Sequence, residues 1–437
     1  MKIKLQIIVL FFICLASVGL KAQDGEFTDV EILQQRTDLL ESAVQKLQKF
    51  KVSGYIQTQY QWAEYQADGN NFKLSNRANA YEAAEEESFG RFGVRRGRIK
   101  FTYEDGIFSG VFQPDFTDKN GSVGITLKDV YLNVRDPWFG TSALRAGIFD
   151  RPFGHEIAYS SSRRESPERS RIFQTLFPDE RDLGAMLILQ PAKTSPWNIL
   201  KLEAGMFAGN GIRPQISSGM DFIGHLSVTK EIGDLSISGG VSAHLGGVLQ
   251  TDSTTFVMED KKFVGTKSGD NFGKYATRQY FGVDFQFSAA TIAGFTNLRA
   301  EYLFGEHAQN KDGNWDYKFT GIPALNSTPV YMRKISGGYI LLAQDLGQTP
   351  FTVVAKYDWY NPNTQVSGNE VGAIGSETVA KDLAMSNIGL GLIWRIDPSL
   401  KLTAYYDIVK NETSENINGW KEDRKDNVLT VRLQYKF

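Results

Sequence analysis

Three basic side chains alternate along residues 91–104, a stretch that is otherwise rich in aromatic and apolar residues. Arg96, Arg98 and Lys100 would share one face of a β-strand, because successive side chains of a strand point to opposite sides. Cations on alternate strand residues lie about 7 Å apart and repel one another. Two interpretations balance this repulsion: an anion that passes along the row, since a row of point charges favours anions without binding them tightly, or acidic neighbours on adjacent strands. The candidate acidic neighbours are Asp115, Asp129 and Glu104.

A second basic cluster lies in residues 151–182, which are too many for a simple hairpin loop. Arginine suits a pore constriction because its planar fork binds phosphate or carboxylate through two parallel hydrogen bonds. We assign to an anion pathway Arg151, Arg163, Arg164, Arg169, Arg171 and Arg181, together with Arg145 beside the predicted turn at 136–140. Because the segment also holds six acidic residues, it is either a constriction loop folded into a pore or a salt-bridged, solvated loop. Arg145 has a second interpretation, as a rim residue in contact with lipid headgroups.

The remaining reactive residue types give no catalytic, metal or cofactor signature. The chain has four His and one Cys, and no histidine stands at a paired metal-ligand spacing or near a serine elbow. No Gly-rich phosphate loop follows a strand and opens a helix. The formal net charge of -2, with basic residues interleaved among acidic ones, argues against nucleic-acid binding. We therefore predict no enzymatic activity, no metal site, no cofactor and no nucleic-acid partner.

Stretches of period-two alternation must position these charges, and they occupy residues 52–437. About sixteen such stretches give roughly 24 residues for each strand with its connection, which is typical of a porin-sized barrel. The last one, residues 429–437, alternates apolar and aromatic side chains with Thr, Arg, Gln and Lys. Short turns alternate with long polar connections, and aromatic residues lie at the ends of the apolar stripes, as in the interfacial girdle of a membrane barrel. The predicted fold class is all-β: a transmembrane antiparallel β-barrel of about sixteen strands in a bacterial outer membrane.

The first fifty residues carry two other signals. Residues 1–22 combine a basic start, an apolar stretch and a small-residue end, which predicts a secretory signal peptide. Residues 23–51 are predicted to be a periplasmic coiled-coil segment, because apolar positions recur at spacings of three and four. Its seam consists of Val30, Leu33, Thr37, Leu40, Val44 and Leu47. The segment is too short for a stable isolated helix, so it either self-associates, for example as a trimer, or folds on its own domain.

Several short motifs are densest between residues 91 and 211. They are Arg95-Arg96-Gly97-Arg98-Ile99, Val130-Tyr131-Leu132, residues 145–154, Glu168-Arg169-Ser170, Arg181-Asp182-Leu183-Gly184 and Phe207-Ala208-Gly209-Asn210-Gly211. In these motifs the sequence resembles the phosphate-selective porin O/P family, over most of the predicted barrel. The resemblance implies a sixteen-stranded barrel, usually trimeric, that admits anions through a lumen lined by Arg and Lys.

The sequence thus predicts an outer-membrane porin that passes small anions, phosphate or related ones, by passive diffusion through a basic lumen. The constriction loop is expected near residues 151–182. The predicted partners are outer-membrane lipid, small anionic solutes and, in a homotrimer, further copies of the chain. Two alternatives stay open: a structural or interaction barrel that uses the N-terminal coil and surface loops, and a general non-selective porin.

Overall fold

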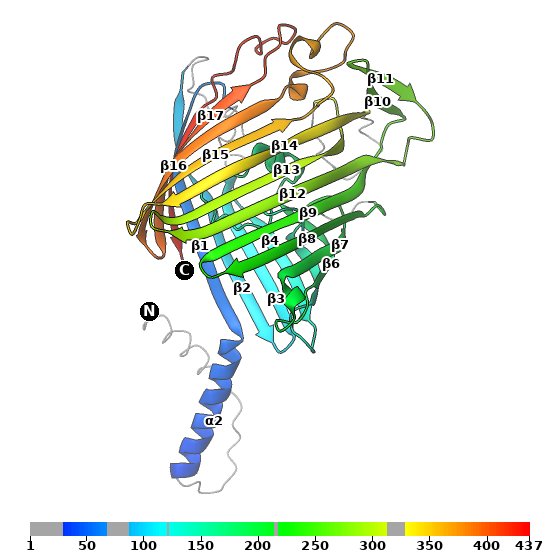
Figure 1. The fold of residues 1–437 in the computed structure, drawn as a ribbon. Coiled ribbons are helices and arrows are strands. Elements are labelled where there is room, and N and C mark those ends of the chain that lie inside the picture. Colours follow the sequence, from blue (N-terminus) through cyan, green and yellow to red (C-terminus); the bar gives the residue numbers. More distant parts are fainter. Residues whose placement is uncertain (1–28, 68–86, 120–121, 214–216, 313–327) are drawn as a thin grey trace. The chain divides into compact units, whose positions relative to one another are not determined.

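The computed structural model describes residues 29–67, 87–119, 122–213, 217–312 and 328–437 (Figure 1). The chain divides into two compact units, Met1–Phe50 and Lys51–Phe437. The predicted signal peptide, residues 1–22, lies outside the described residues. In the part of the chain that the structure describes, no helix is both long and apolar enough to cross a membrane.

The first unit contains the helix α2 (Asp29–Gln48). It falls within residues 23–51, where the sequence predicts a coiled-coil segment. The predicted seam residues from Leu33 to Leu47 are exposed, and the side chain of Val30 lies outside the described residues. The pairing of this helix with a partner helix stays a prediction.

The second unit is built on one sheet, whose wall strands pair in antiparallel fashion. Over the described residues this sheet has 18 strands, two of which form a hairpin inside a connection and sixteen of which form the wall. The wall strands are β1 (Phe50–Ala63), β2 (Phe89–Asp105), β3 (Phe108–Lys119), β4 (Ser122–Arg135), β5 (Ala143–Asp150), β6 (Arg181–Leu189), β7 (Leu200–Phe207), β8 (Asp221–Ile232), β9 (Leu235–Leu249), β12 (Tyr275–Thr291), β13 (Gly294–Gln309), β14 (Val330–Asp345), β15 (Phe351–Asn361), β16 (Met385–Asp397), β17 (Leu400–Asn411) and β18 (Val428–Lys436). The hairpin strands are β10 (Thr254–Glu259) and β11 (Lys262–Lys267).

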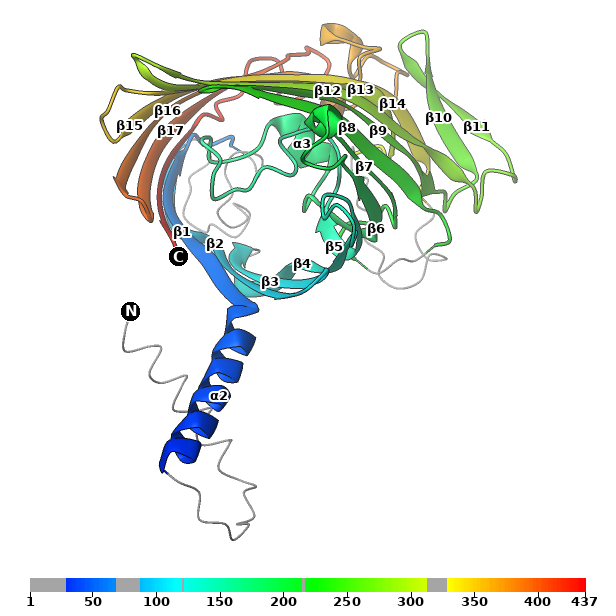
Figure 2. The ribbon, with the colours of Figure 1, turned by 60° about the horizontal axis from the view of Figure 1, so that its bottom comes forward.

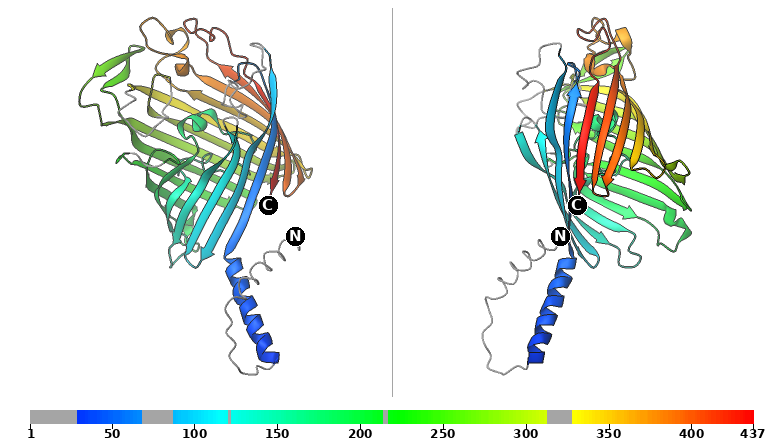
Figure 3. Two further views of the ribbon diagram at one scale, coloured as in Figure 1. Left: turned by 180° about the vertical axis from the view of Figure 1, so that it is seen from behind. Right: turned by 90° about the vertical axis from the view of Figure 1, so that its left-hand side faces the viewer.

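The sheet closes on itself into a barrel, because β1 pairs with both β2 and β18. The β1–β18 register runs from Tyr55 opposite Lys436 to Ala63 opposite Val428. Figure 3 shows β1 beside β18 at this closure. Closure leaves no free sheet edge to expose unpaired backbone groups to lipid. The predicted all-β, sixteen-stranded antiparallel barrel is confirmed.

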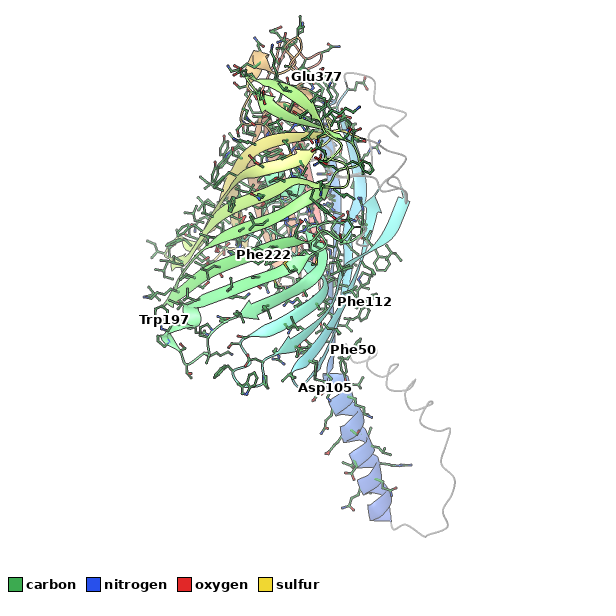
Figure 4. All side chains as sticks on the ribbon, turned by 90° about the vertical axis from the view of Figure 1, so that its right-hand side faces the viewer. Phe50, Asp105, Phe112, Trp197, Phe222 and Glu377 are labelled. Carbon is green, nitrogen blue, oxygen red and sulfur yellow. The ribbon has the colours of Figure 1, made fainter. Side chains whose placement is uncertain are left out.

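Along the wall strands, side chains alternate between an apolar outer face and a more polar inner face. In β18, Leu433 and Tyr435 are exposed, whereas Thr430, Arg432 and Gln434 are buried. A soluble protein would bury the apolar set instead, so this inside-out pattern identifies a barrel whose outer wall meets lipid. Phe112 and Phe222 lie on this outer face in Figure 4.

The two ends of the barrel differ in the length of their connections. One end carries short turns, such as the two-residue turn between β8 and β9, together with the C-terminal end of β18. The other end carries the long connections, including the β10–β11 hairpin between β9 and β12. Figure 4 shows Trp197 at the short-turn end and Glu377 at the long-loop end. This alternation is the plan of outer-membrane barrels.

One long connection, residues 151–180 between β5 and β6, lies inside the ring of strands (Figure 2). We call it the inserted loop; it contains the short helix α3 (Arg171–Leu176). Its apolar side chains are buried against inward-facing residues of the wall. The loop residues of this cluster are Phe153, Ile157, Ile172, Phe173, Leu176 and Phe177. The predicted constriction segment thus lies inside the barrel, and its role as a constriction stays a prediction.

Candidate permeation pathway

Two cavities lie between the basic face of β2 and the inserted loop. The loop-side cavity, about 260 Å³, is lined among others by Arg95, Arg96, Arg98, Glu168, Arg169 and Glu180. The turn-side cavity, about 360 Å³, is lined among others by Arg98, Lys100, Arg163, Arg169, Arg181 and Lys436. Because β2 runs from the long-loop end to the short-turn end, the cavities follow one another along the barrel. They share Arg98 and Arg169 and therefore trace a candidate permeation pathway.

Two members of the predicted basic row, Arg96 and Arg98, are buried and neutralised by the protein itself. Arg96 donates to the side-chain oxygen of Gln57 at 2.9 Å, and its guanidinium lies 3.4 Å from a carboxylate oxygen of Glu168. Arg98 donates from Nε to Oδ2 of Asp115 at 2.9 Å. The acidic-neighbour interpretation therefore applies to both arginines, and Asp115 is one of the neighbours that the sequence suggested.

The third member, Lys100, is different. It is only half-buried and lines the turn-side cavity. Arg163 is exposed at the same cavity. Neither side chain forms a hydrogen bond or ion pair with any residue that the structure describes. These two cations are therefore available to a solute.

Three arginines of the inserted loop and its flanking strand are paired with carboxylates of the protein, and these pairs hold the loop in place. Their contacts are Arg151 with Asp182 (3.2 Å), Arg181 with Asp129 (2.9 Å), and Arg169 with Glu180 and with the backbone carbonyl of Ile157 (2.9 Å). Burial alone would raise the pKa of Glu180, but the positive charges of Arg169, Lys128 and Arg181 hold it well below its usual range. Glu180 is therefore an anion that links the loop to the wall.

The other predicted pathway arginines lie away from both cavities. Arg164 is buried and donates to the backbone carbonyls of Ser166 (3.3 Å) and Pro167 (3.2 Å). Burial, with the nearby charge of Arg169, lowers the pKa of Arg164 to about 10.

Arg171 begins α3, where its backbone N–H donates to Asp358 at 3.0 Å. Arg145 lies on β5, with its guanidinium 4.7 Å from the ring centre of Tyr131 and 5.6 Å from that of Phe149. Of the predicted anion-pathway residues, the structure brings to the two cavities Arg96, Arg98, Lys100, Arg163, Arg169 and Arg181.

The charge balance differs between the two cavities. The loop-side cavity has five cationic side chains (Arg95, Arg96, Arg98, Lys128 and Arg169) and four acidic ones (Asp115, Glu168, Asp179 and Glu180). The turn-side cavity has six cationic side chains (Arg98, Lys100, Arg163, Arg169, Arg181 and Lys436) and two acidic ones (Asp129 and Asp150). An excess of positive charge in a narrow, low-dielectric passage raises the local concentration of anions. The excess of positive charge is therefore larger on the short-turn side of the pathway.

The barrel is similar to a family of outer-membrane channels. The family model described as phosphate-selective porin O and P matches residues 63–437. The chain belongs to this family. The predicted resemblance is confirmed, and the porin lies in the bacterial outer membrane, where its family and barrel point to a channel rather than an enzyme.

Solved structures are similar to this porin at low sequence identity, and one of them has a TM-score of 0.55. The high-pH structure of Pseudomonas putida OprB is 9% identical, with 92% of this chain and 97% of that chain covered and a TM-score of 0.55. A loop L8 deletion mutant of Vibrio cholerae OmpT is 10% identical, with 89% and 99% covered and a TM-score of 0.49. Salmonella typhi OmpF in complex with daunomycin is 10% identical, with 89% and 97% covered and a TM-score of 0.49. Among curated protein sequences, none is detectably similar to this porin.

The main residue of the porin's pathway that sequence reasoning missed is Glu168. This carboxylate accepts hydrogen bonds from Arg95 (2.8 Å) and Arg432 (2.8 Å) and pairs with Arg96. Burial alone would raise the pKa of Glu168, but the three guanidinium groups hold it well below its usual range. The alternation of β18 predicts that Arg432 points inward. It does not predict the pairing with Glu168, because the two residues are 264 positions apart in the sequence.

Proposed function

We propose that this porin conducts small anions, phosphate and related ones, by passive diffusion through the loop-side and turn-side cavities. The observation that carries the proposal is the turn-side cavity, where six cationic side chains face two acidic ones. Lys100 and Arg163 have no ionic partner among the described residues and are the side chains that we assign to the passing anion. The paired arginines shape the passage without binding a solute strongly, and conduction requires such weak binding.

The proposed assembly is a homotrimer in outer-membrane lipid, with residues 1–22 removed as a signal peptide and residues 23–51 in the periplasm. The resemblance to the porin O/P family supports the trimer, because it implies a barrel that is usually trimeric. A second proposed role, as an interaction barrel, is favoured by the exposed apolar seam of α2. The two roles are compatible, because the seam residues lie outside the Lys51–Phe437 unit that contains the pathway.

The reversal potential in a salt gradient tests the proposal in planar bilayers. The wild type should prefer chloride to potassium, and added phosphate should reduce the chloride current. A double variant, Lys100→Gln with Arg163→Gln, should lower the chloride-to-potassium permeability ratio by about two- to fivefold, since one charge at about 4 Å is worth about 1 kcal/mol in water. Lys267→Gln, on the exposed β11 hairpin strand, removes a charge elsewhere and should leave the ratio unchanged.

Two results would count against anion conduction. A wild type that prefers potassium contradicts it outright. A ratio near one in both the wild type and the double variant instead supports the general non-selective porin.

A further inference from the structure

In the part of the chain that the structure describes, the helix α2 presents an exposed apolar stripe. Its seam leucines Leu33, Leu40 and Leu47 are 61%, 57% and 42% exposed, and Val44 is 48% exposed. An apolar stripe of this kind on a helix is stable in water only when another surface covers it. We propose that α2 of other copies of this chain covers it, in a parallel, in-register coiled coil.

The spacing of the stripe fits such a coil. From Leu33 onward the seam recurs at intervals of four and three residues, so that leucine occupies every d position and Thr37 and Val44 occupy a positions. Thr37 is the one polar member, and its hydroxyl donates to the backbone carbonyl of Leu33 at 2.9 Å. Because its hydrogen-bonding group is already satisfied within the helix, Thr37 can be buried at low cost.

The charges beside the stripe match in the parallel arrangement. In a parallel coiled coil the g position of one helix faces the e position five residues further along its partner. Arg36 occupies a g position and Glu41, five residues later, the following e position. Neither side chain has an ion pair with another residue in the part of the chain that the structure describes. Each copy would therefore offer its Arg36 to Glu41 of the next copy.

The short connection between α2 and β1 also favours a parallel arrangement of the helices. Only Lys49 separates the last residue of α2 from the first residue of β1. Barrels in one membrane share a single orientation, so every copy joins its helix to its barrel at the same membrane face and in the same direction. Barrels that lie side by side also hold their helices at a high local concentration, which favours association of a helix too short to be stable alone.

Disulfide cross-linking of the full mature chain tests the pairing. The only cysteine of the sequence is Cys14, within the predicted signal peptide, so the mature chain is a cysteine-free background. Leu40→Cys places a thiol at a d position, and Ser42→Cys places one on the opposite, f, side of the same helix. After mild oxidation, Leu40→Cys should give several-fold more covalently linked chains on a non-reducing gel than Ser42→Cys. Equal yields from the two variants, or no linkage with Leu40→Cys, would overturn the proposal.

A charge exchange tests the register. In the Leu40→Cys background, Arg36→Glu or Glu41→Arg alone brings like charges together and should reduce the linkage yield. The combined exchange restores opposite charges and should restore the yield; a further loss in the combined variant contradicts the register. All these variants should keep the conductance and ion preference of the wild type, because the substitutions lie in the Met1–Phe50 unit. Failure of the coil is thereby distinguished from failure of the pore.

Discussion

The lumen has two walls of different chemistry. The polar wall, β1 to β4 with β18, turns mostly polar and charged side chains inward, among them Gln57, Gln59, Arg96, Gln113, Lys128 and Arg432. The packed wall, β12 to β16, turns large apolar and aromatic side chains inward, among them Tyr280, Leu303, Tyr339, Val354 and Ile393. Both candidate cavities lie along the polar wall.

Two cationic residues of the packed wall, Arg299 and Lys356, are bound to carboxylates of the inserted loop. Arg299 donates to both carboxylate oxygens of Glu165, at 2.6 Å and 2.9 Å. Lys356 donates to Glu156 at 2.9 Å, and both of these side chains are buried. Such buried pairs cost desolvation and are retained only where geometry is good, so they fix the loop's position.

The inserted loop has two sides, one that packs against the packed wall and one that faces the polar wall. Its apolar side, with Phe173 against the ring of Tyr339 at 6.3 Å between centres, fills the lumen along the packed wall. Its charged side, with Glu168 and Glu180, faces the polar wall and lines the loop-side cavity, which Phe173 also borders. Packing on one side therefore determines how wide the passage is on the other.

The largest effect is expected from weakening the packed side. Phe173→Ala removes a ring that is 2% exposed, and such truncations of buried Phe cost about 3–5 kcal/mol. We expect the loop to loosen, with a larger and noisier single-channel conductance and protease cleavage within residues 151–180. The control Phe112→Ala removes the same ring from the lipid-facing side and should change neither property. Unchanged conductance and cleavage in Phe173→Ala would show that packing does not hold the loop.

A smaller effect is expected from the polar side. Glu168→Gln leaves Arg95, Arg96 and Arg432 without their shared anion, at a cost of about 1.5–3 kcal/mol, the range for a hydrogen bond to a charged group. We expect a wider passage and a stronger preference for anions, because one negative charge leaves the loop-side cavity.

The matched control for this prediction is Glu104→Gln on the same strand as Arg96. Glu104 pairs with Lys51 at 2.8 Å, but both side chains are well exposed, and such pairs are worth about 0–1 kcal/mol. Reversal potentials of the two variants provide the measurement. A Glu168→Gln channel that becomes less anion-preferring would contradict the place given to Glu168 in the pathway.

The two walls also differ in how well the sequence predicts which face of each strand points inward. On the polar wall, inward Arg and Gln alternate with outward apolar residues, so the period of two fixes both the strand and its inner face. On the packed wall, inward Ile335, Tyr339 and Leu341 of β14 are as apolar as outward Ile340 and Leu342. Composition therefore does not distinguish the faces of β14, and the predicted constriction loop carries no pattern that shows which strands it packs against.

For the candidate site, the sequence likewise predicts the face on which the side chains lie but not their partners. The alternation of β2 places Arg96, Arg98 and Lys100 on one inner face, but it does not tell which of them is neutralised. For Arg96 that depends on a partner far along the chain, Glu168, which lies 72 residues away. The β10–β11 hairpin was likewise hidden inside a predicted long loop, because its two short strands extend beyond the wall rather than form part of it.

The smallest effect is expected from acidification, which acts on His155 where the loop meets the packed wall. Burial, reinforced by the positive charge of Arg299, lowers the pKa of His155 from 6.5 to about 4. The docked loop therefore keeps His155 neutral, whereas a released loop would bind a proton below about pH 6.5, so docking weakens gradually as the pH falls from about 6.5 to about 4.

Glu168 does not contribute in the upper part of that range, because its pKa lies well below 4.5 and its ion pairs are lost only as the pH falls through that lower value. Between pH 6.5 and 4.5 the conductance of the wild type should therefore rise slightly, and that of His155→Gln should rise less. An equal rise in both channels would mean that another group, and not His155, couples the packed wall to the width of the passage.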